Sequence, residues 1–143
     1  MKIGYTYVVA DIFHVGHLRY LKGAKKLCDK LIVGVLTDDA TMERKDQPTI
    51  PYKQRLEIVK SIGCVDEVVM QDTYTPLHNV KAIKPHVLIE SSSHHKDDIA
   101  EARQFIKRFD GRVEVLPYYK GQSSTLIKGK IIYEYTQQEA ISS

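Results

Sequence analysis

The sequence contains no apolar stretch long enough to cross a membrane. Its longest apolar runs, such as residues 31–36, hold about six residues, whereas a bilayer span needs about 20. The first residues read Met-Lys-Ile-Gly-Tyr, which is strand-like and lacks a small-residue cleavage site, so we expect no signal peptide. These absences predict a cytoplasmic protein that has no membrane partner.

Cysteine and net charge are also scarce. The chain has two cysteines, Cys28 and Cys64, which lie far apart in the sequence and have no histidine cluster around them. We interpret both as reduced packing residues of an intracellular protein. The net charge is +3, from 21 basic and 18 acidic residues. This weak excess is compatible with an anionic small molecule and does not predict nucleic-acid binding.

The 143 residues suit one domain, and 43% hydrophobic with 27% charged residues is a globular balance. Apolar runs alternate with segments of helical periodicity. The expected strands cover residues 2–9, 31–36, 67–70, 86–90 and 113–118, and the expected helices cover 17–28, 51–62, 97–111 and 123–135. This alternation predicts an α/β, Rossmann-like domain over 1–136, with a doubly wound parallel five-stranded sheet and helices on both faces. Residues 137–143 are expected to form a loose tail.

The loop after the first expected strand carries the most informative residues. His14 and His17 are three positions apart and flank Gly16 at the start of a helix. Amides and the dipole at a helix start favour an anion, and a glycine lets a phosphate approach the backbone. Imidazoles donate hydrogen bonds to phosphate. Either histidine alone could be a surface residue, but the pair with its glycine predicts a phosphate site.

The His-Val-Gly-His segment matches the His-x-Gly-His signature of the cytidylyltransferase-like nucleotidyltransferases, and the sequence resembles that family from about residue 3 to 131. A second match near the end, Gly-Gln-Ser-Ser-Thr-Leu-Ile-Lys at residues 121–128, is similar to the family's Gly-Ile-Ser-Ser/Thr-Thr-x-Ile motif. Further segments that resemble the family are 18–29, 36–39, 51–55 and 65–68. The two motifs in this order make the resemblance specific.

The resemblance implies that an acceptor phosphate or phosphonate attacks the α-phosphorus of a nucleoside triphosphate, and that pyrophosphate leaves without a covalent intermediate. His14, His17 and Lys45 would be the catalytic residues, which hold the triphosphate and stabilise the transition state. The implied nucleotide-binding residues are Val9, Ala10, Asp11, Phe13, Gly16, Arg55, Glu90, Gln122, Ser123, Ser124 and Thr125. Mg²⁺ would bind through the nucleotide's own oxygens, with no metal site in the protein.

Several of these residues have a purely structural alternative. Ser123 is a good helix N-cap whatever the function. Lys45 could belong to a solvated loop, and Arg55 could pair with Glu57 or Asp66. The adjacent pair His94 and His95 is interpreted as loop histidines near the nucleotide rather than as metal ligands.

The sequence departs from the family at four places. Val-Val-Ala-Asp at residues 8–11 replaces Gly-Thr-Phe-Asp, and Glu-Ser-Ser-Ser at 90–93 replaces a Gly-Asp-Asp-Trp stretch that helps to select the base. Tyr118 stands where the family has an arginine, for which Lys120 is a candidate substitute, and Gln122 replaces an isoleucine. The Ala-Asp pair resembles cytidylyltransferases that act on phosphonates.

These observations favour transfer of CMP from CTP to a small phosphorylated or phosphono alcohol in a biosynthetic reaction. An alternative is an adenylyltransferase that uses ATP, of the sugar-phosphate, FMN or phosphopantetheine type, because residues 37–41 are compatible with the heptose-phosphate branch. A nucleotide-binding module without activity is the third possibility, which the missing arginine motivates. The family resemblance also implies a homodimer.

Overall fold

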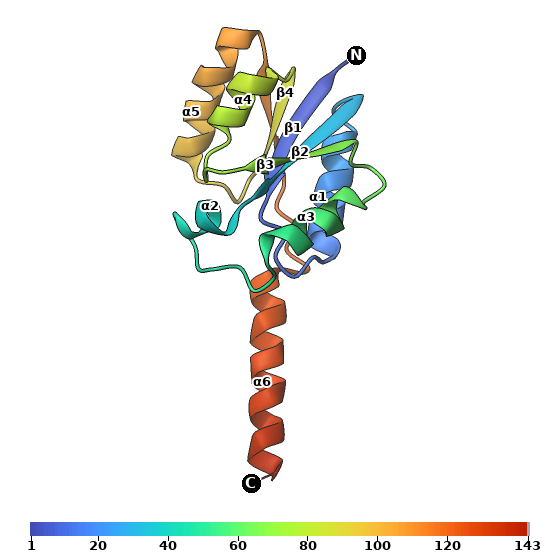
Figure 1. The fold of residues 1–143 in the computed structure, drawn as a ribbon, viewed down its shortest axis with the longest axis vertical. Helices are drawn as coiled ribbons and strands as arrows, with labels where there is room; N and C mark the ends of the chain where they lie inside the picture. Colours follow the sequence, from blue (N-terminus) through green and yellow to red (C-terminus); the bar gives the residue numbers. More distant parts are fainter. Residues whose placement is uncertain (143) are drawn as a thin grey trace.

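The structure is a computed structural model that describes residues 1–142. Five parallel strands form one sheet in the order β3-β2-β1-β4-β5 (Figure 1). The strands are β1 (Ile3–Val8), β2 (Lys30–Leu36), β3 (Glu67–Gln71), β4 (Val87–Ser91) and β5 (Arg112–Leu116). This confirms the doubly wound parallel sheet that the alternating pattern predicts.

Helices cover both faces of the sheet, as expected. They are α1 (Val15–Lys25), α2 (Asp38–Met42), α3 (Tyr52–Lys60), α4 (Leu77–Ile83), α5 (Lys96–Ile106) with the 3₁₀ turn η1 (Lys107–Phe109), and α6 (Ser124–Ser142). Figure 1 shows α1 and α3 on one face and α4 and α5 on the other. The central strands bury residues on both faces, which explains why β2 reads as a continuous apolar run.

Two apolar clusters fill the space between the sheet and its helices. Side chains of β1, β4 and α5, among them Tyr5, Leu88 and Ile106, form one cluster. The other joins side chains of β2, α1 and α3, among them Val33, Leu21 and Val59. Both cysteines are free and pack at the edge of this second cluster, in agreement with their interpretation as packing residues. The two clusters hold the strand ends, and therefore the loops that follow them, in fixed positions.

The strand order reverses beside β1. The chain proceeds from β1 through β2 to β3 on one side and from β4 to β5 on the other. Ligands of such sheets bind at the carboxyl ends of the strands where this reversal occurs. The loops after β1 and β4, at residues 9–14 and 92–95, are therefore placed side by side at a binding position.

The structure corrects the expected elements in three places. Helices α2 and α4 were not expected, because five and seven residues are too few for a clear apolar period. Residues 137–142 were expected to be loose and are helical, because α6 continues to Ser142. Nothing after Gly129 interrupts this helix, since its remaining residues include no proline or glycine. Residue 143 lies outside the described residues, and the division at residue 136 stays a prediction.

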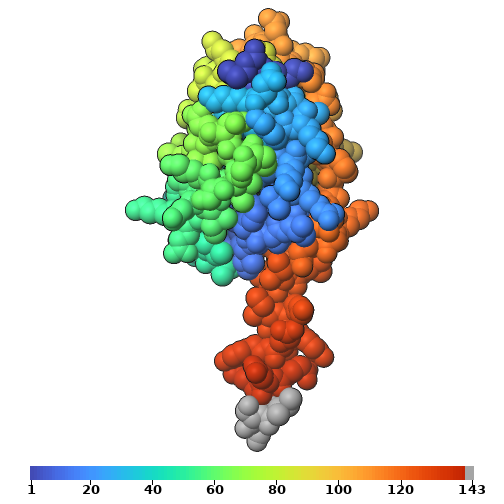
Figure 2. Space-filling view, turned by 90° about the vertical axis from the view of Figure 1, so that its right-hand side faces the viewer, coloured from blue at the N-terminus to red at the C-terminus, as the bar shows by residue number. Residues whose placement is uncertain are grey.

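Helix α6 projects from the domain as a single rod (Figures 1 and 2). Its residues 129–140 are all exposed. Four large side chains on it, Ile131, Ile132, Tyr133 and Tyr135, are between 55% and 66% exposed. No helix within residues 1–142 is both long and apolar enough to cross a membrane.

Candidate active site

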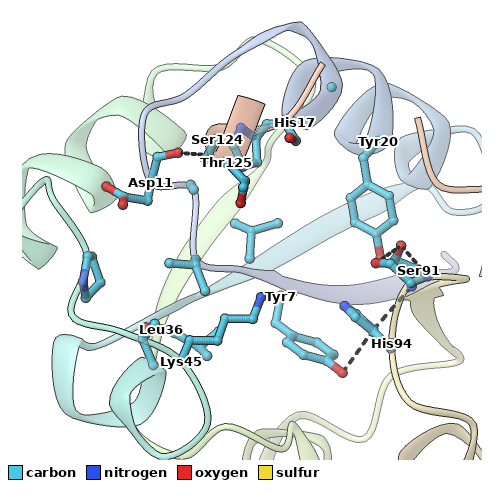
Figure 3. A pocket seen from close by; sticks show the side chains of 18 of the residues that line it. Tyr7, Asp11, His17, Tyr20, Leu36, Lys45, Ser91, His94, Ser124 and Thr125 are labelled. Carbon is cyan, nitrogen blue, oxygen red and sulfur yellow. Dashed lines mark hydrogen bonds between the residues drawn. The ribbon is translucent and has the colours of Figure 1, made fainter. Parts of the chain in front are cut away.

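A cavity of about 820 Å³ opens at the carboxyl ends of the central strands, a size typical of small-molecule sites. Most of the residues that the sequence suggests lie in its wall, namely Val9, Ala10, Asp11, His14, Gly16, His17, Lys45, Gln122, Ser123, Ser124 and Thr125. Figure 3 shows His17, Ser124 and Thr125 on one side of the cavity, with Lys45 and His94 on the opposite side. The cavity therefore has a side built from the two motifs and a side built from other elements.

Each of the two motif histidines uses one ring nitrogen to cap helix α1. The Nδ1 atom of His14 accepts a hydrogen bond from the Gly16 amide at 3.0 Å, and the Nδ1 atom of His17 accepts one from the His14 amide at 3.2 Å. The ring centroids are 4.0 Å apart. Because Nδ1 is an acceptor in both rings, each neutral ring carries its proton on Nε2. Both histidines thus have an N–H group left for an anion.

Burial keeps these two rings neutral at physiological pH. It lowers the pKa of His14, and it is the main reason why the pKa of His17 falls to about 4. The neighbouring His14 and Lys45 lower the pKa of His17 further, against the opposing charge of Asp11. The rings therefore act as hydrogen-bond donors rather than as fixed charges.

Gly16 is required by the close approach of two loops. A Cβ atom at this position would lie 2.7 Å from Cε1 of His14 and 3.2 Å from the Gln122 carbonyl oxygen. A side chain there would displace the His14 ring. Phe13 lies outside the cavity wall and stacks on His17 with ring centroids 5.2 Å apart. Its position supports the imidazole from behind, and the expected contact of Phe13 with the nucleotide stays a prediction.

The first turn of α6 reaches the same side of the cavity. The Ser123 Oγ accepts a hydrogen bond from the Leu126 amide at 3.0 Å, so this serine is an N-cap, as its structural alternative proposed. The Ser124 hydroxyl donates to the carbonyl oxygen of Asp11. Thr125 lines the cavity beside them. The serine and threonine motif therefore attaches the start of α6 to the loop after β1.

Asp11 is the centre of this attachment. Its carboxylate accepts hydrogen bonds from the Thr49 and Ile50 amides, both at 2.9 Å, and from Lys128 Nζ at 2.7 Å. Burial raises the pKa of Asp11, but these three donors, Lys128 foremost, outweigh it and hold the pKa below its usual value. The adjacent residue Ala10 has a positive φ of 59°. Such strained backbone persists only where its surroundings fix it, and it occurs often at functional sites.

A model of cytidylyltransferase-like proteins matches residues 6–130. The chain belongs to the cytidylyltransferase-like family. This confirms the resemblance that the two motifs suggest, and it places the chain among nucleotidyltransferases.

Similar proteins agree with this membership. The bifunctional proteins HldE of Trichlorobacter lovleyi and Geobacter metallireducens are 30% and 33% identical to the chain over 141 and 140 residues. In both cases the match covers 96% of this chain but only 28% of the relative, so the chain spans little more than a quarter of these proteins.

Solved structures show the same fold. A lipopolysaccharide core biosynthesis protein from Thermoplasma volcanium superposes with a TM-score of 0.73 at 26% identity, over 85% of this chain and 99% of that one. TmcAL of Thermotoga maritima, bound with alpha-thio ATP, superposes with a TM-score of 0.68 at 13% identity, over 96% of this chain and 52% of that one. The second likeness concerns the fold alone.

Arg55, expected to bind the nucleotide, is fully buried and lies outside the cavity wall of this cytidylyltransferase-like domain. Its guanidinium donates to the carbonyl oxygens of Val9, Leu36 and Ile50 at 2.6 to 2.8 Å. A fourth hydrogen bond, at 2.6 Å, goes to the Asp38 carboxylate, and neither Glu57 nor Asp66 is its partner. Arg55 therefore ties the ends of β1 and β2 together, because a planar guanidinium can serve several acceptors at once.

Glu90 is also buried beneath the cavity instead of lining it, with 1% of its surface exposed. Its Oε2 atom accepts a hydrogen bond from the Tyr7 hydroxyl at 2.7 Å and contacts Nδ1 of His94. Its Oε1 atom has no hydrogen-bond partner among the described residues. The direct contact with the nucleotide that was expected of Glu90 is thus replaced by a contact with His94, which does line the cavity.

Lys120, the candidate substitute for the missing family arginine, lies outside the cavity wall. Tyr118 lines the cavity and is 45% exposed, and Tyr119 packs under Arg19, whose guanidinium carbon is 4.7 Å from the ring centroid. The cation near the second motif is Lys128, one turn into α6. Helical spacing from Ser124 places Lys128 on the same side of α6, and this signal could have identified it.

Tyr7, Tyr74 and Arg44 are among the cavity residues that the sequence analysis did not identify. Tyr7 points into the site from β1, and Tyr74 and Arg44 approach from the loops after β3 and α2. Arg44 is paired with Asp98 and lies over the Tyr74 ring at 4.8 Å. No local pattern marks these residues, because the sheet order alone brings them together.

Within residues 1–142, no three His, Cys, Asp or Glu side chains converge so that they could hold a metal ion. The Asp11 carboxylate is occupied by Lys128 and two amides. These residues fit Mg²⁺ only as an ion carried by the triphosphate oxygens. Mg²⁺ bound in this way stays a prediction.

Proposed function

We propose that this chain transfers the nucleoside monophosphate group of a nucleoside triphosphate to a small phosphorylated acceptor and releases pyrophosphate. The observation that supports this best is the convergence of His14, His17 and the start of α6 on one cavity wall. Imidazole N–H groups, a hydroxyl and the amides of a helix N-terminus meet there. Each of these donors suits phosphate oxygens, and together they would bind a triphosphate.

In the proposed reaction, an oxygen of the acceptor phosphate attacks the α-phosphorus and forms the new bond. The bond from the α-phosphorus to its bridging oxygen breaks, and the electron pair leaves with pyrophosphate. The Nε2–H groups of His14 and His17 would stabilise charge on the oxygens of the α-phosphorus. Thr125 and the first amides of α6 would hold the outer phosphates, and Lys45 would add a point charge. Mg²⁺, when bound to the triphosphate, supplies further neutralisation of its charge.

For the substrates, we propose ATP as the donor and a sugar phosphate as the acceptor. Residues 37–41 are compatible with the heptose-phosphate branch of the adenylyltransferases, and a solved structure at 26% identity is that of a lipopolysaccharide core biosynthesis protein. CTP with a phosphorylated or phosphono alcohol is the second candidate, supported by the Ala10-Asp11 pair after β1.

Pyrophosphate release tests this proposal. The chain is assayed with Mg²⁺ while ATP, CTP, GTP and UTP are each combined with sugar phosphates, glycerol 3-phosphate and phosphono alcohols. His14→Ala and His17→Ala should each lower kcat/KM by at least about 100-fold, because each removes a charge-stabilising donor. His78→Ala, a matched change of a histidine outside the cavity wall, should leave it unchanged. Equal activity of all three variants would reject the roles of the motif histidines.

We also propose a homodimer, as the family resemblance implies. The exposed apolar side chains of α6 support this proposal, because a helix that carries large apolar residues around its surface is usually covered. We expect a second copy of the chain to pack against these side chains. Sedimentation velocity of the parent chain measures this directly.

A further inference from the structure

A second cavity of about 490 Å³ adjoins the first. The two share part of their walls, including Tyr7, Lys45, Tyr74 and His94. Lys45 links the second cavity to the reaction centre, because it lines both this cavity and the one that holds His14 and His17. A molecule whose phosphate lies at Lys45 would therefore reach the α-phosphorus with one end and fill the adjoining cavity with the other.

His94 lies at the junction of the two cavities and is held in one orientation. Its ring stacks on Tyr7 with centroids 5.0 Å apart and an interplanar angle of 24°. Its Nδ1 atom contacts the buried carboxylate of Glu90, which also accepts from the Tyr7 hydroxyl. Figure 3 shows the Tyr7 and His94 rings side by side at the cavity wall opposite Ser124 and Thr125. A side chain fixed by stacking and by a buried carboxylate is positioned as binding sites require.

The contact with Glu90 decides which nitrogen of His94 is free. A carboxylate only accepts hydrogen bonds, so Nδ1 carries the proton. The Ser91 amide and the Tyr7 hydroxyl each lie 3.3 Å from the same nitrogen, but the Tyr7 hydroxyl donates its proton to Glu90, and the carboxylate can pair with Nδ1 only if that nitrogen carries a proton. The neutral ring then offers the lone pair of Nε2. His94 is thus an acceptor, in contrast to His14 and His17, whose Nε2 atoms donate.

We infer that the adjoining cavity binds the hydroxyl-bearing body of the acceptor and that Nε2 of His94 accepts a hydrogen bond from one of its hydroxyls. The inference rests on the proposed function. The remaining chemistry of the wall agrees with it, because Glu101 adds carboxylate oxygens and Lys45 adds positive charge at the junction, while Asp98 and Arg44 are paired with each other. A phosphate at the basic junction and hydroxyls at the acceptor groups describe a phosphorylated polyol. Glu90 is the positioning residue that sets the tautomer of His94.

Acceptor kinetics test the contact of His94. His94→Phe keeps a ring to stack on Tyr7 and removes Nε2. With glucose 1-phosphate, or whichever of the assayed polyol phosphates is turned over, this variant should raise the KM of the acceptor by about 5- to 10-fold, the effect of one lost hydrogen bond. The KM of the nucleotide and kcat should stay within about twofold, and His78→Phe should match the parent chain. An unchanged acceptor KM, or an equal rise in the nucleotide KM, would overturn the inference.

Monodeoxy acceptors sharpen this test. One deoxy derivative of the acceptor should be weaker than its parent compound with the unchanged chain and no weaker with His94→Phe, because the two changes remove the same contact. If each deoxy derivative raises the acceptor KM by the same factor with the unchanged chain and with His94→Phe, His94 does not bind a hydroxyl.

The role of Glu90 is read from nitrogen NMR signals. In the unchanged chain at neutral pH, His94 should show a protonated Nδ1 and an unprotonated Nε2, and His14 should show the reverse. Glu90→Gln can donate to Nδ1, so it should invert the tautomer of His94 and raise the acceptor KM as His94→Phe does. A variant that only loses stability, with the tautomer and KM retained, would contradict the positioning role.

Failure of the proposed function is distinguishable from failure of this inference. If the chain releases no pyrophosphate with any acceptor, the proposed function fails. The inference is then judged by titrating glucose 1-phosphate and glycerol 3-phosphate into the chain, loaded with a non-hydrolysable nucleotide, while the His94 signals are recorded. Shifts of His94 without shifts of His78 would support the polyol site, and unchanged His94 signals with both compounds would overturn it.

Discussion

The sequence leaves two roles open for Arg55, support of the fold and binding of the nucleotide. Replacing Arg55 should lower the stability of the fold in the first case and raise the KM of the nucleotide in the second. Arg55→Met keeps an apolar stem of similar length and removes all four hydrogen bonds of the guanidinium. The buried carbonyl oxygen of Leu36 and the partly buried ones of Val9 and Ile50 lose their donor, and an unsatisfied buried group costs about 1–3 kcal/mol. Asp38 is 35% exposed, so water can replace its partner.

Arg55→Met should lower the free energy of unfolding by about 3–5 kcal/mol. Removal of the buried charge offsets part of the cost of leaving the carbonyl oxygens without a donor. In a chain of this size this net loss lowers Tm by about 6–20 °C. Urea and thermal unfolding measure the loss, with Lys53→Met, an exposed residue of the same helix, as the control. A loss below about 1 kcal/mol together with a large rise in the nucleotide KM would refute the reasoning and restore Arg55 as a ligand of the nucleotide.

Three further outcomes are expected. The pKa of His17 is about 4 in the folded chain and 6.5 in the unfolded chain, so the unfolded chain binds more protons between these two pH values. The free energy of unfolding should therefore fall by about 2 kcal/mol from pH 7 to pH 5. Urea unfolding measures this fall, which should be smaller for His17→Asn. Gly16→Ala should displace His14 and lower kcat/KM at least about 10-fold in the pyrophosphate assay, whereas Gly63→Ala, whose Cβ meets nothing within 4 Å, should have no effect. Ile132→Glu should shift the proposed dimer to monomer in sedimentation velocity, and a parent chain that is monomeric at micromolar concentration would reject the dimer.

The sheet could be predicted from the sequence because its strands are buried on both faces. The continuous apolar run of β2 and the short run of β4 mark buried strands, and the helical periods of α1 and α5 separate them. Helix α4 could not be predicted in this way. It is short, and it ends at Lys84 in a left-handed conformation that the sequence does not signal with glycine.

The motif side of the site could be predicted because its residues are close in the sequence and take recognisable types. His14, Gly16, His17 and the serine and threonine at 123–125 all reach the cavity. The opposite side depends on the strand order, which places Tyr7 of β1 beside the end of β4. The structural role of Arg55 was one of two that the sequence left open, and its complete burial could not be predicted because a fully buried arginine is rare.

Helix α6 connects the cavity wall rigidly to a point far outside the cavity. Its first turn is tied to Asp11 through Ser124 and Lys128, and the whole helix has 19 residues, about 28 Å at 1.5 Å per residue. A helix behaves as a stiff rod over this length, so a tilt of about 5° at the phosphate end displaces the outer end by about 2 Å. A spectroscopic label on the outer half of α6 would thus report the filling of the cavity from outside it, without touching any group that binds substrate.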